Sequence, residues 1–377
     1  MQSQLDEHGI GTSNFLIKGA MMRYSVFVPK LYNFCKSVGF TAGKMLPSRA
    51  FCSDESQGFP IILITKHFGC FPFNHGMVGG IVATDRHGPH ADHGKDLLII
   101  QASHVGYDAD DKRFGVYRRL QTDSNSLSSN CGKIDSVLEW YLSEYRFARE
   151  NIFIRQERGQ FFVTIDNQFL DESRKEGLFL RVDRLTSATH LVEVLSTSKQ
   201  FVASAELVAQ LSNEEANSEN NVAILNHLTA SFFYYKREIE GGIEGHGHLE
   251  NNLLDVMPVI VTSNAPLLTA AMFNTRAEFD RSYRSIIKNR RYLGKKVLLI
   301  SGINIDISPQ PGQVFPLTKF VPWAAYIQSD DGSGVTYEQK ELLEVLSQQS
   351  AENADQIDLE NAISEMVEAN EVLVEAG

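Results

Sequence analysis

The sequence predicts an α/β protein with a mixed or parallel sheet flanked by helices. Two short apolar runs, 59–64 and 96–100, are rich in isoleucine and bounded by Gly, Pro and Asp, which is typical of buried strands. Further strands are expected at 161–165 and at 297–300, the latter ending in a turn at 301–304. Strands that alternate with helices favour this architecture.

The expected helices follow from apolar residues at helical spacing. Residues 134–149 carry the clearest pattern and are predicted to form an amphipathic helix. Helical segments are also expected around 188–195 and 203–211, and the polar stretch 212–221 is expected to be a loop or linker.

The last part of the chain has a different composition. After a loop at 330–334, residues 338–375 contain eleven acidic residues and one basic residue, Lys340, with leucines and other apolar residues suggesting a stripe. We therefore expect one domain over residues 1–330 and an acidic, helical C-terminal extension over residues 331–377. That extension either packs on the domain as solvated helices or docks a partner.

Composition excludes several classes of protein. The formal net charge is −12, which argues against a nucleic-acid binder because phosphate contacts need a basic face. No segment has the length of apolar sequence that a membrane span needs, and the polar, acidic start resembles no targeting signal, so a cytoplasmic protein is expected. Four cysteines in 377 residues indicate reduced thiols rather than a disulfide framework, and Cys35 and Cys70 are expected to be buried ones.

The other two cysteines and one histidine are candidate metal ligands. Cys52 is followed two residues later by Asp54, and His104 follows the predicted strand at 97–100. Cys131 precedes the predicted helix at 134–149, where the positive end of the helix dipole favours a thiolate. Thiolate and imidazole groups are the ligands that zinc prefers in a reducing compartment. Local sequence makes each of these residues a candidate without requiring the role.

A series of short motifs between residues 68 and 134 carries a family resemblance. In order they are Gly69-Cys70-Phe71-Pro72-Phe73, Gly79-Gly80, His93-Gly94, Leu98-Ile99-Ile100, His104-Val105-Gly106, Gly115, Arg118-Arg119 and Asn130-Cys131-Gly132. In order and approximate spacing they resemble the limiting-CO2-inducible B family, also called theta-class carbonic anhydrases.

The resemblance implies an active site like that of β-class carbonic anhydrases. Cys52, His104 and Cys131 would hold Zn²⁺ with water in the fourth position, and Asp54 would orient the reacting group. The implied function is zinc-dependent reversible hydration of CO2 to bicarbonate by zinc-bound hydroxide, carried out by a homodimer. Cys52-Ser53-Asp54 is the single Cys-X-Asp sequence in the chain.

One position departs from the family pattern. The family places an arginine two residues after the aspartate, and here that position is Ser56. Such an arginine holds the aspartate away from the metal by a charge-assisted pair, and without it Asp54 could close the fourth position, as in structural zinc sites. Four arginines are candidates to replace it: Arg49, Arg86, Arg118 and Arg119. The alternative function is therefore a catalytically inactive, zinc-stabilised homologue that binds bicarbonate or a partner chain.

A histidine-rich stretch offers proton carriers. His87, His90 and His93 are candidate proton shuttles, because histidine exchanges protons near neutral pH, and Arg86 lies beside them. A second metal site or a dimer contact in this stretch stays an alternative. Phe71, Phe73 and Val105 are candidate walls of a CO2 pocket. A hydrolase that uses Cys131 or Cys70 with His104 lacks any local signature, and no glycine-rich loop has the spacing of a phosphate-binding loop.

Overall fold

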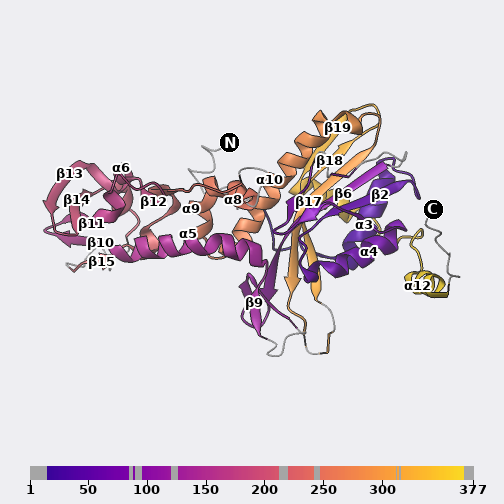
Figure 1. Cartoon of the computed structure of the whole chain (residues 1–377), viewed down its shortest axis with the longest axis horizontal. Coiled ribbons are helices and arrows are strands. Elements are labelled where there is room, and N and C mark those ends of the chain that lie inside the picture. Colours follow the sequence, from indigo (N-terminus) through magenta and orange to yellow (C-terminus); the bar gives the residue numbers. More distant parts are fainter. Residues whose placement is uncertain are drawn as a thin grey trace, which may run out of the picture. The chain divides into compact units, whose positions relative to one another are not determined.

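The computed structural model describes residues 15–84, 88–89, 96–119, 126–211, 220–241, 247–310, 312–313 and 316–368, apart from the side chains of 188–190. The chain forms two compact units, seen in Figure 1. We call Leu16–Lys112, Val116–Ser128 and Thr275–Gly377 the sheet unit, and Met1–Phe15, Arg113–Gly115 and Ser129–Asn274 the middle unit. The single domain expected over residues 1–330 stays a prediction.

The sheet unit contains the central sheet and the helices that cover it. Its strands are β1 (Met22–Arg23), β2 (Met45–Ala50), β3 (Phe73–Asn74), β4 (Gly76–Met77), β5 (Ile81–Val82), β6 (Asp96–Asp108), β8 (Val116–Arg118), β9 (Leu127–Ser129), β17 (Val297–Ile307), β18 (Leu317–Gln328) and β19 (Gly334–Glu338). Its helices are α3 (Tyr24–Ser37), η1 (Glu55–Gln57), α4 (Gly58–Phe68), η9 (Arg290–Tyr292), α11 (Gln339–Ser347) and α12 (Leu359–Glu368).

The central sheet is mixed, as the sequence predicts. Its order is β1-β18-β17-β6-β2-β3, with β19 paired to β18. Strands β17, β6, β2 and β3 run parallel, whereas β18 is antiparallel to β17 and to both β1 and β19. Parallel strands at the centre read as continuous apolar runs because both of their faces are covered.

Helices cover both faces of this sheet. On one face, Phe27 of α3 and Leu342 of α11 pack with Leu98 and Ile100 of β6. On the other face, Leu97 and Ile99 pack against the C-terminal half of α10 (Pro266–Lys288), which continues from the middle unit. Alternate residues of a strand point to opposite faces, so one apolar strand supplies both cores. Figure 1 shows α3 and α4 beside this sheet.

Two sequence-based assignments in this unit were wrong. Residues 59–64, predicted to be a strand, belong to helix α4. A short apolar run does not distinguish a buried strand from a buried helix, and Pro60 in the first turn with Gly69 at φ 73° after the last turn is a helix signature. The turn expected at 301–304 is the middle of β17, which continues to Ile307 through an irregularity in its pairing with β18 between Ser301 and Gly302.

After the turn at 330–333, the chain returns to the sheet as β19 before the helices begin. Leu342 and Leu346 of α11 are fully buried in the core that α3 shares, whereas the described part of α12 exposes Ile363, Met366 and Val367. Residues 369–377 of the expected extension lie outside the described residues.

The middle unit combines an antiparallel sheet with short helices around one long one. Its strands are β7 (Arg113–Phe114), β10 (Ile152–Glu157), β11 (Gln160–Asp166), β12 (Gly177–Leu180), β13 (Thr186–Val194), β14 (Ser198–Ala203), β15 (Val222–Ala223) and β16 (Phe233–Lys236). Its helices are α5 (Gly132–Asn151), η3 (Asn167–Leu170), α6 (Val182–Leu185), α7 (Ala205–Val208), η5 (Leu225–His227), η6 (Ala230–Phe232), α8 (His248–Leu253), η8 (Leu254–Val256), α9 (Met257–Val261) and the first part of α10.

The predictions for this unit had mixed outcomes. The helix expected at 134–149 is confirmed as α5, and the strand at 161–165 as β11. The helix expected around 188–195 was wrong: residues 188–194 lie in β13, which pairs with β14 in the sheet order β13-β14-β11-β10-β15. Helix α7 covers only part of 203–211, and residues 212–219 lie outside the described residues. In the part of the chain that the structure describes, no helix is both long and apolar enough to cross a membrane.

Candidate metal centre

Cys52 lies just beyond the carboxyl end of β2. The residue is 3% exposed, and its Sγ accepts a hydrogen bond from the backbone N–H of Gly79 at 3.2 Å. Gly80 follows at φ 74°, and a Cβ there would lie 2.9 Å from the Cα of Ser103 on β6. The Gly79-Gly80 pair therefore lets one loop approach both the thiol and the central strand, which a larger residue at Gly80 would prevent.

His104 lies within a strand rather than after one. The sequence placed it in a loop beyond Ile100, but β6 continues to Asp108 and pairs His104 with Asn304 of β17. The imidazole is fully buried, and its Nδ1 lies 2.8 Å from Oδ2 of Asp306. Because a carboxylate only accepts hydrogen bonds, Nδ1 carries the proton and Nε2 is the ring nitrogen left to bind a metal.

Asp306 is the residue of this centre that sequence reasoning missed. It is fully buried on β17, which continues beyond the strand end predicted at Ile300. Besides His104, it accepts hydrogen bonds from Ser56 Oγ at 2.8 Å, from Thr318 Oγ1 at 2.9 Å and from Gln57 Nε2 at 2.9 and 3.0 Å. The sequence signal for this residue was an acidic side chain two positions after Asn304 in a mostly apolar strand. Buried carboxylates need hydrogen-bond partners, so such a residue points to a polar site.

Cys131 is the N-cap residue of α5, with extended backbone angles, and its thiol is 1% exposed. A 20-residue helix begins directly after it. The first turn of a helix carries unpaired N–H groups and a partial positive charge, which favours a thiolate at this position.

The three predicted ligands come together. One ligand atom from each of Cys52, His104 and Cys131 lies within 4.8 Å of the other two, and all three residues are buried. Two thiols and an imidazole whose other nitrogen is held by a carboxylate are a donor set that fits a metal ion. The described residues thus contain a buried Cys–His–Cys cluster that could bind a metal.

Asp54 is restrained by two different partners. Its Oδ1 accepts from the backbone N–H of Ser56 at 3.1 Å, and its Oδ2 lies 3.4 Å from the guanidinium of Arg119. Arg119 also donates to Glu55 and stacks over the ring of Tyr117. Asp54 does not belong to the group of mutually close ligand atoms formed by the two cysteines and His104.

Charge and burial act in opposite directions on the pKa of Arg119 and in the same direction on the pKa of Tyr117. Burial lowers the pKa of Arg119. The hydrogen bond to Glu55 and the charges of Glu55 and Asp54 raise it by more, so the pKa lies above its usual value. Burial raises the pKa of Tyr117, and the carboxylates of Asp306, Glu55 and Asp54 add to that rise. Tyr117 therefore stays a neutral phenol beside a firmly charged guanidinium.

The remaining candidates are placed as follows. Arg118 lies 3.9 Å from Asp110, and Arg49 is half-buried in β2, with its pKa lowered by burial. Phe71 and Phe73 are 71% and 47% exposed, whereas Val105 is fully buried. Arg86, His87, His90 and His93 lie outside the described residues.

The protein is therefore a mixed α/β protein with a buried Cys–His–Cys cluster that could hold a metal ion. Among solved structures, the chain resembles PtLCIB4, a homolog of the limiting CO2-inducible protein LCIB, with a TM-score of 0.52 and 12% identity over 87% of this chain and 97% of that one. A histidine-to-alanine mutant of PtLCIB4 gives a TM-score of 0.51 and 12% identity over 86% and 96%. At this identity the likeness establishes the fold. No protein-family model and no curated protein matches the sequence.

Proposed function

We propose that this protein is a member of the limiting-CO2-inducible B family and a zinc-dependent carbonic anhydrase, which interconverts CO2 and bicarbonate. The single observation that carries the proposal is the contact of Arg119 with Asp54 beside the Cys52–His104–Cys131 cluster. The family arginine is absent from position 56, and Arg119 supplies a guanidinium to the same carboxylate from elsewhere in the chain.

The residues would divide the work as follows. Cys52, His104 and Cys131 hold the zinc ion, and Asp306 fixes the tautomer and the orientation of His104. A zinc ion held by these residues would act as a Lewis acid. It would lower the pKa of a bound water to about 7, the value known for carbonic anhydrase. Asp54, held by Arg119 and the Ser56 N–H, would accept a hydrogen bond from the reacting group and would not itself serve as a metal ligand. His87, His90, His93 and Arg86 stay proposed proton carriers or basic neighbours.

The hydrogen bond of Ser56 to Asp306 supports the carbonic anhydrase proposal rather than an inactive site. Its hydroxyl donates to Asp306, so it helps to orient His104 instead of leaving a gap. An arginine at this position would have to displace that hydrogen bond at a residue that is 1% exposed. The catalytically inactive, zinc-stabilised homologue nevertheless remains the second candidate, because a serine at position 56 cannot itself form an ion pair with Asp54.

The decisive experiment is CO2 hydration by stopped flow on zinc-reconstituted protein, with zinc content measured on the same samples. We expect zinc-dependent hydration that is lost, together with bound zinc, in Cys131→Ser. Cys70→Ser is the matched control, because Cys70 lies outside the cluster. A protein that binds one zinc ion but does not hydrate CO2 would refute the enzymatic proposal and favour the binding role for bicarbonate or a partner chain.

A homodimer is also proposed. Four apolar side chains between residues 71 and 78 are each at least 46% exposed in the single chain: Phe71, Phe73, Met77 and Val78. They directly precede Gly79, whose N–H binds Cys52, so a second copy covering them would also exclude water near the centre. Sedimentation at several concentrations should show a dimer that weakens in Phe71→Ser; a monomer at every concentration would reject this part of the proposal.

The structure holds Cys35, Cys52, Cys70 and Cys131 as reduced cysteines, and a cysteine that binds a metal needs a reducing compartment. The cytoplasmic location expected from the sequence is part of the proposal.

A further inference from the structure

The middle unit contains a large cavity with no assigned role. Its volume is about 660 Å³, which lies in the range of small-molecule sites. The walls come from the C-terminal half of α5, from α6, from the segment 226–234 and from η8, α9 and the residues after them. Cys52, His104 and Cys131 do not line it.

Three arginines give the cavity a positive wall. They are Arg149, Arg181 and Arg184, and Asp255 is the acidic residue among the lining side chains. The chain as a whole carries a net charge of −12, so this local excess runs against the average. A concave surface lined by one sign of charge concentrates ligands of the opposite sign.

The three guanidinium groups differ in how they are held. Arg184 is compensated: it pairs with both carboxylate oxygens of Glu206 at 2.9 and 3.1 Å. Arg149 donates to Asn226 Oδ1 at 3.2 Å and lies over the ring of Tyr145, without a carboxylate among the described residues.

Arg181 is the most available cation. Within the described part of the chain its guanidinium makes no ion pair or side-chain hydrogen bond; the residue is exposed, and its Cζ lies over the ring of Tyr234, 5.8 Å from the ring centre. A guanidinium over an aromatic ring keeps its N–H donors available for a planar or tetrahedral oxyanion.

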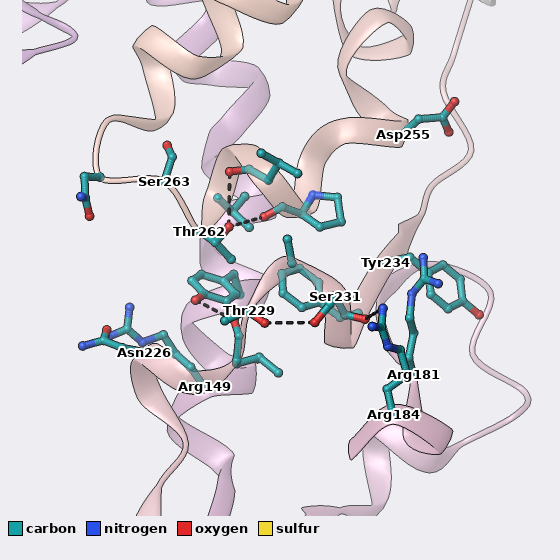
Figure 2. A pocket seen from close by; sticks show the side chains of 18 residues that line it. Arg149, Arg181, Arg184, Asn226, Thr229, Ser231, Tyr234, Asp255, Thr262 and Ser263 are labelled. Atoms are coloured by element: carbon teal, nitrogen blue, oxygen red, sulfur yellow. Dashed lines mark hydrogen bonds between the residues drawn. The ribbon is translucent and has the colours of Figure 1, made fainter. Parts of the chain in front are cut away.

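Hydroxyl groups lie between these cations. Figure 2 shows Arg149 on one side of the cavity, Arg181 and Arg184 on the other, and Thr229 and Ser231 between them. The hydroxyls of Thr229 and Ser231 are 3.1 Å apart, and Ser231 also donates to Glu206. Because the single Ser231 hydroxyl proton goes to Glu206, Thr229 donates to Ser231, and the two hydroxyls offer acceptor lone pairs to the polar part of a ligand while the arginines supply the donors for its anionic groups.

We propose that this cavity binds a small organic anion that carries phosphate or carboxylate groups, with Arg181 and Arg149 as its two ligand-binding cations. Arg184, fixed by Glu206, shapes the wall and adds less to affinity. The site is separate from the proposed metal centre, so its ligand would be a second ligand or an effector rather than CO2.

The test is isothermal titration calorimetry on the full chain with two probes, inorganic pyrophosphate and succinate. We expect saturable 1:1 binding of at least one probe, which weakens by about tenfold or more in Arg181→Gln and in Arg149→Gln, since each variant removes a charge-assisted hydrogen bond. Arg146→Gln is the matched control, because Arg146 lies on the same helix α5, is exposed and does not line the cavity.

Each outcome decides the proposal. Binding of pyrophosphate alone identifies phosphate as the recognised group, and binding of succinate alone identifies carboxylate. Failure of both probes to bind at millimolar concentration overturns the proposal, as does binding that Arg181→Gln and Arg149→Gln leave unchanged. Circular dichroism of both variants must match the unmodified protein, and a variant that fails this check is replaced by the corresponding Arg→Lys substitution, which keeps the charge and loses the planar fork.

Discussion

Asp306→Asn is the substitution that most directly tests the proposed metal centre. The carboxylate is fully buried and takes hydrogen bonds from four side chains, those of His104, Ser56, Gln57 and Thr318. An asparagine keeps the shape but replaces one acceptor oxygen by an NH2 donor. The change therefore removes the negative charge behind His104 and creates a conflict between donors.

The size of the effect follows from these contacts. The hydroxyls of Ser56 and Thr318 can rotate and accept instead, and Gln57 Nε2 keeps an acceptor because it lies within 3.1 Å of Ser56 Oγ and within reach of both side-chain oxygens of residue 306. The hydrogen bonds to residue 306 lose their charge assistance, which costs about 1 kcal/mol of folding free energy. Loss of the carboxylate partner of a metal-binding histidine costs about 10- to 100-fold in metal affinity or activity.

Both magnitudes are measurable on the same variant. Urea unfolding of the metal-free protein gives the change in folding free energy, and competition with a chromophoric chelator gives the zinc affinity. Ser56→Ala is the graded comparison, because it removes one donor and leaves the carboxylate charge in place. Unchanged zinc affinity in Asp306→Asn would show that the carboxylate does not support His104 as a ligand, and the site would have to be reinterpreted.

Three further predictions concern the neighbouring residues and the core. Arg119→Gln should reduce CO2 hydration, measured by stopped flow, about tenfold with zinc content unchanged, because Asp54 loses a charge-assisted contact. Arg118→Gln is the control, because Arg118 pairs with Asp110 and not with Asp54. Equal losses of activity in both variants would reject the role of Arg119. Burial lowers the pKa of His75 to about 3, far below its unfolded value of about 6.5. Between these two pH values the unfolded state binds a proton that the folded state does not. The free energy of unfolding should therefore fall as the pH drops from about 6.5 towards 3. Unfolding free energies of His75→Gln at several pH values should show that fall reduced by about 1.4 kcal/mol per pH unit; an unaltered slope would contradict the assignment. Phe27→Ala should destabilise the sheet unit by about 3–5 kcal/mol in urea unfolding, because the fully buried ring stacks on Phe320 at 4.1 Å, and a loss below about 1 kcal/mol would mean that the core collapses around the change.

The sequence predicted elements well where one local signal was sufficient. Helix α5 shows a clear amphipathic pattern, and the apolar runs 97–100 and 297–300 lie in the central strands β6 and β17, whose two faces are both covered. Residues 59–64 and 188–195 were assigned to the wrong element because short segments carry too few residues for their periodicity to decide.

Local sequence and the family resemblance together identified the candidate ligands Cys52, His104 and Cys131, because the residue types that bind soft metals are few and four cysteines leave little choice. Only the tertiary structure decided what surrounds them. Arg119 meets Asp54 across 65 positions of the chain, and Asp306 meets His104 across 202. Such pairings depend on which strands lie side by side in the sheet, and local sequence contains no record of that order.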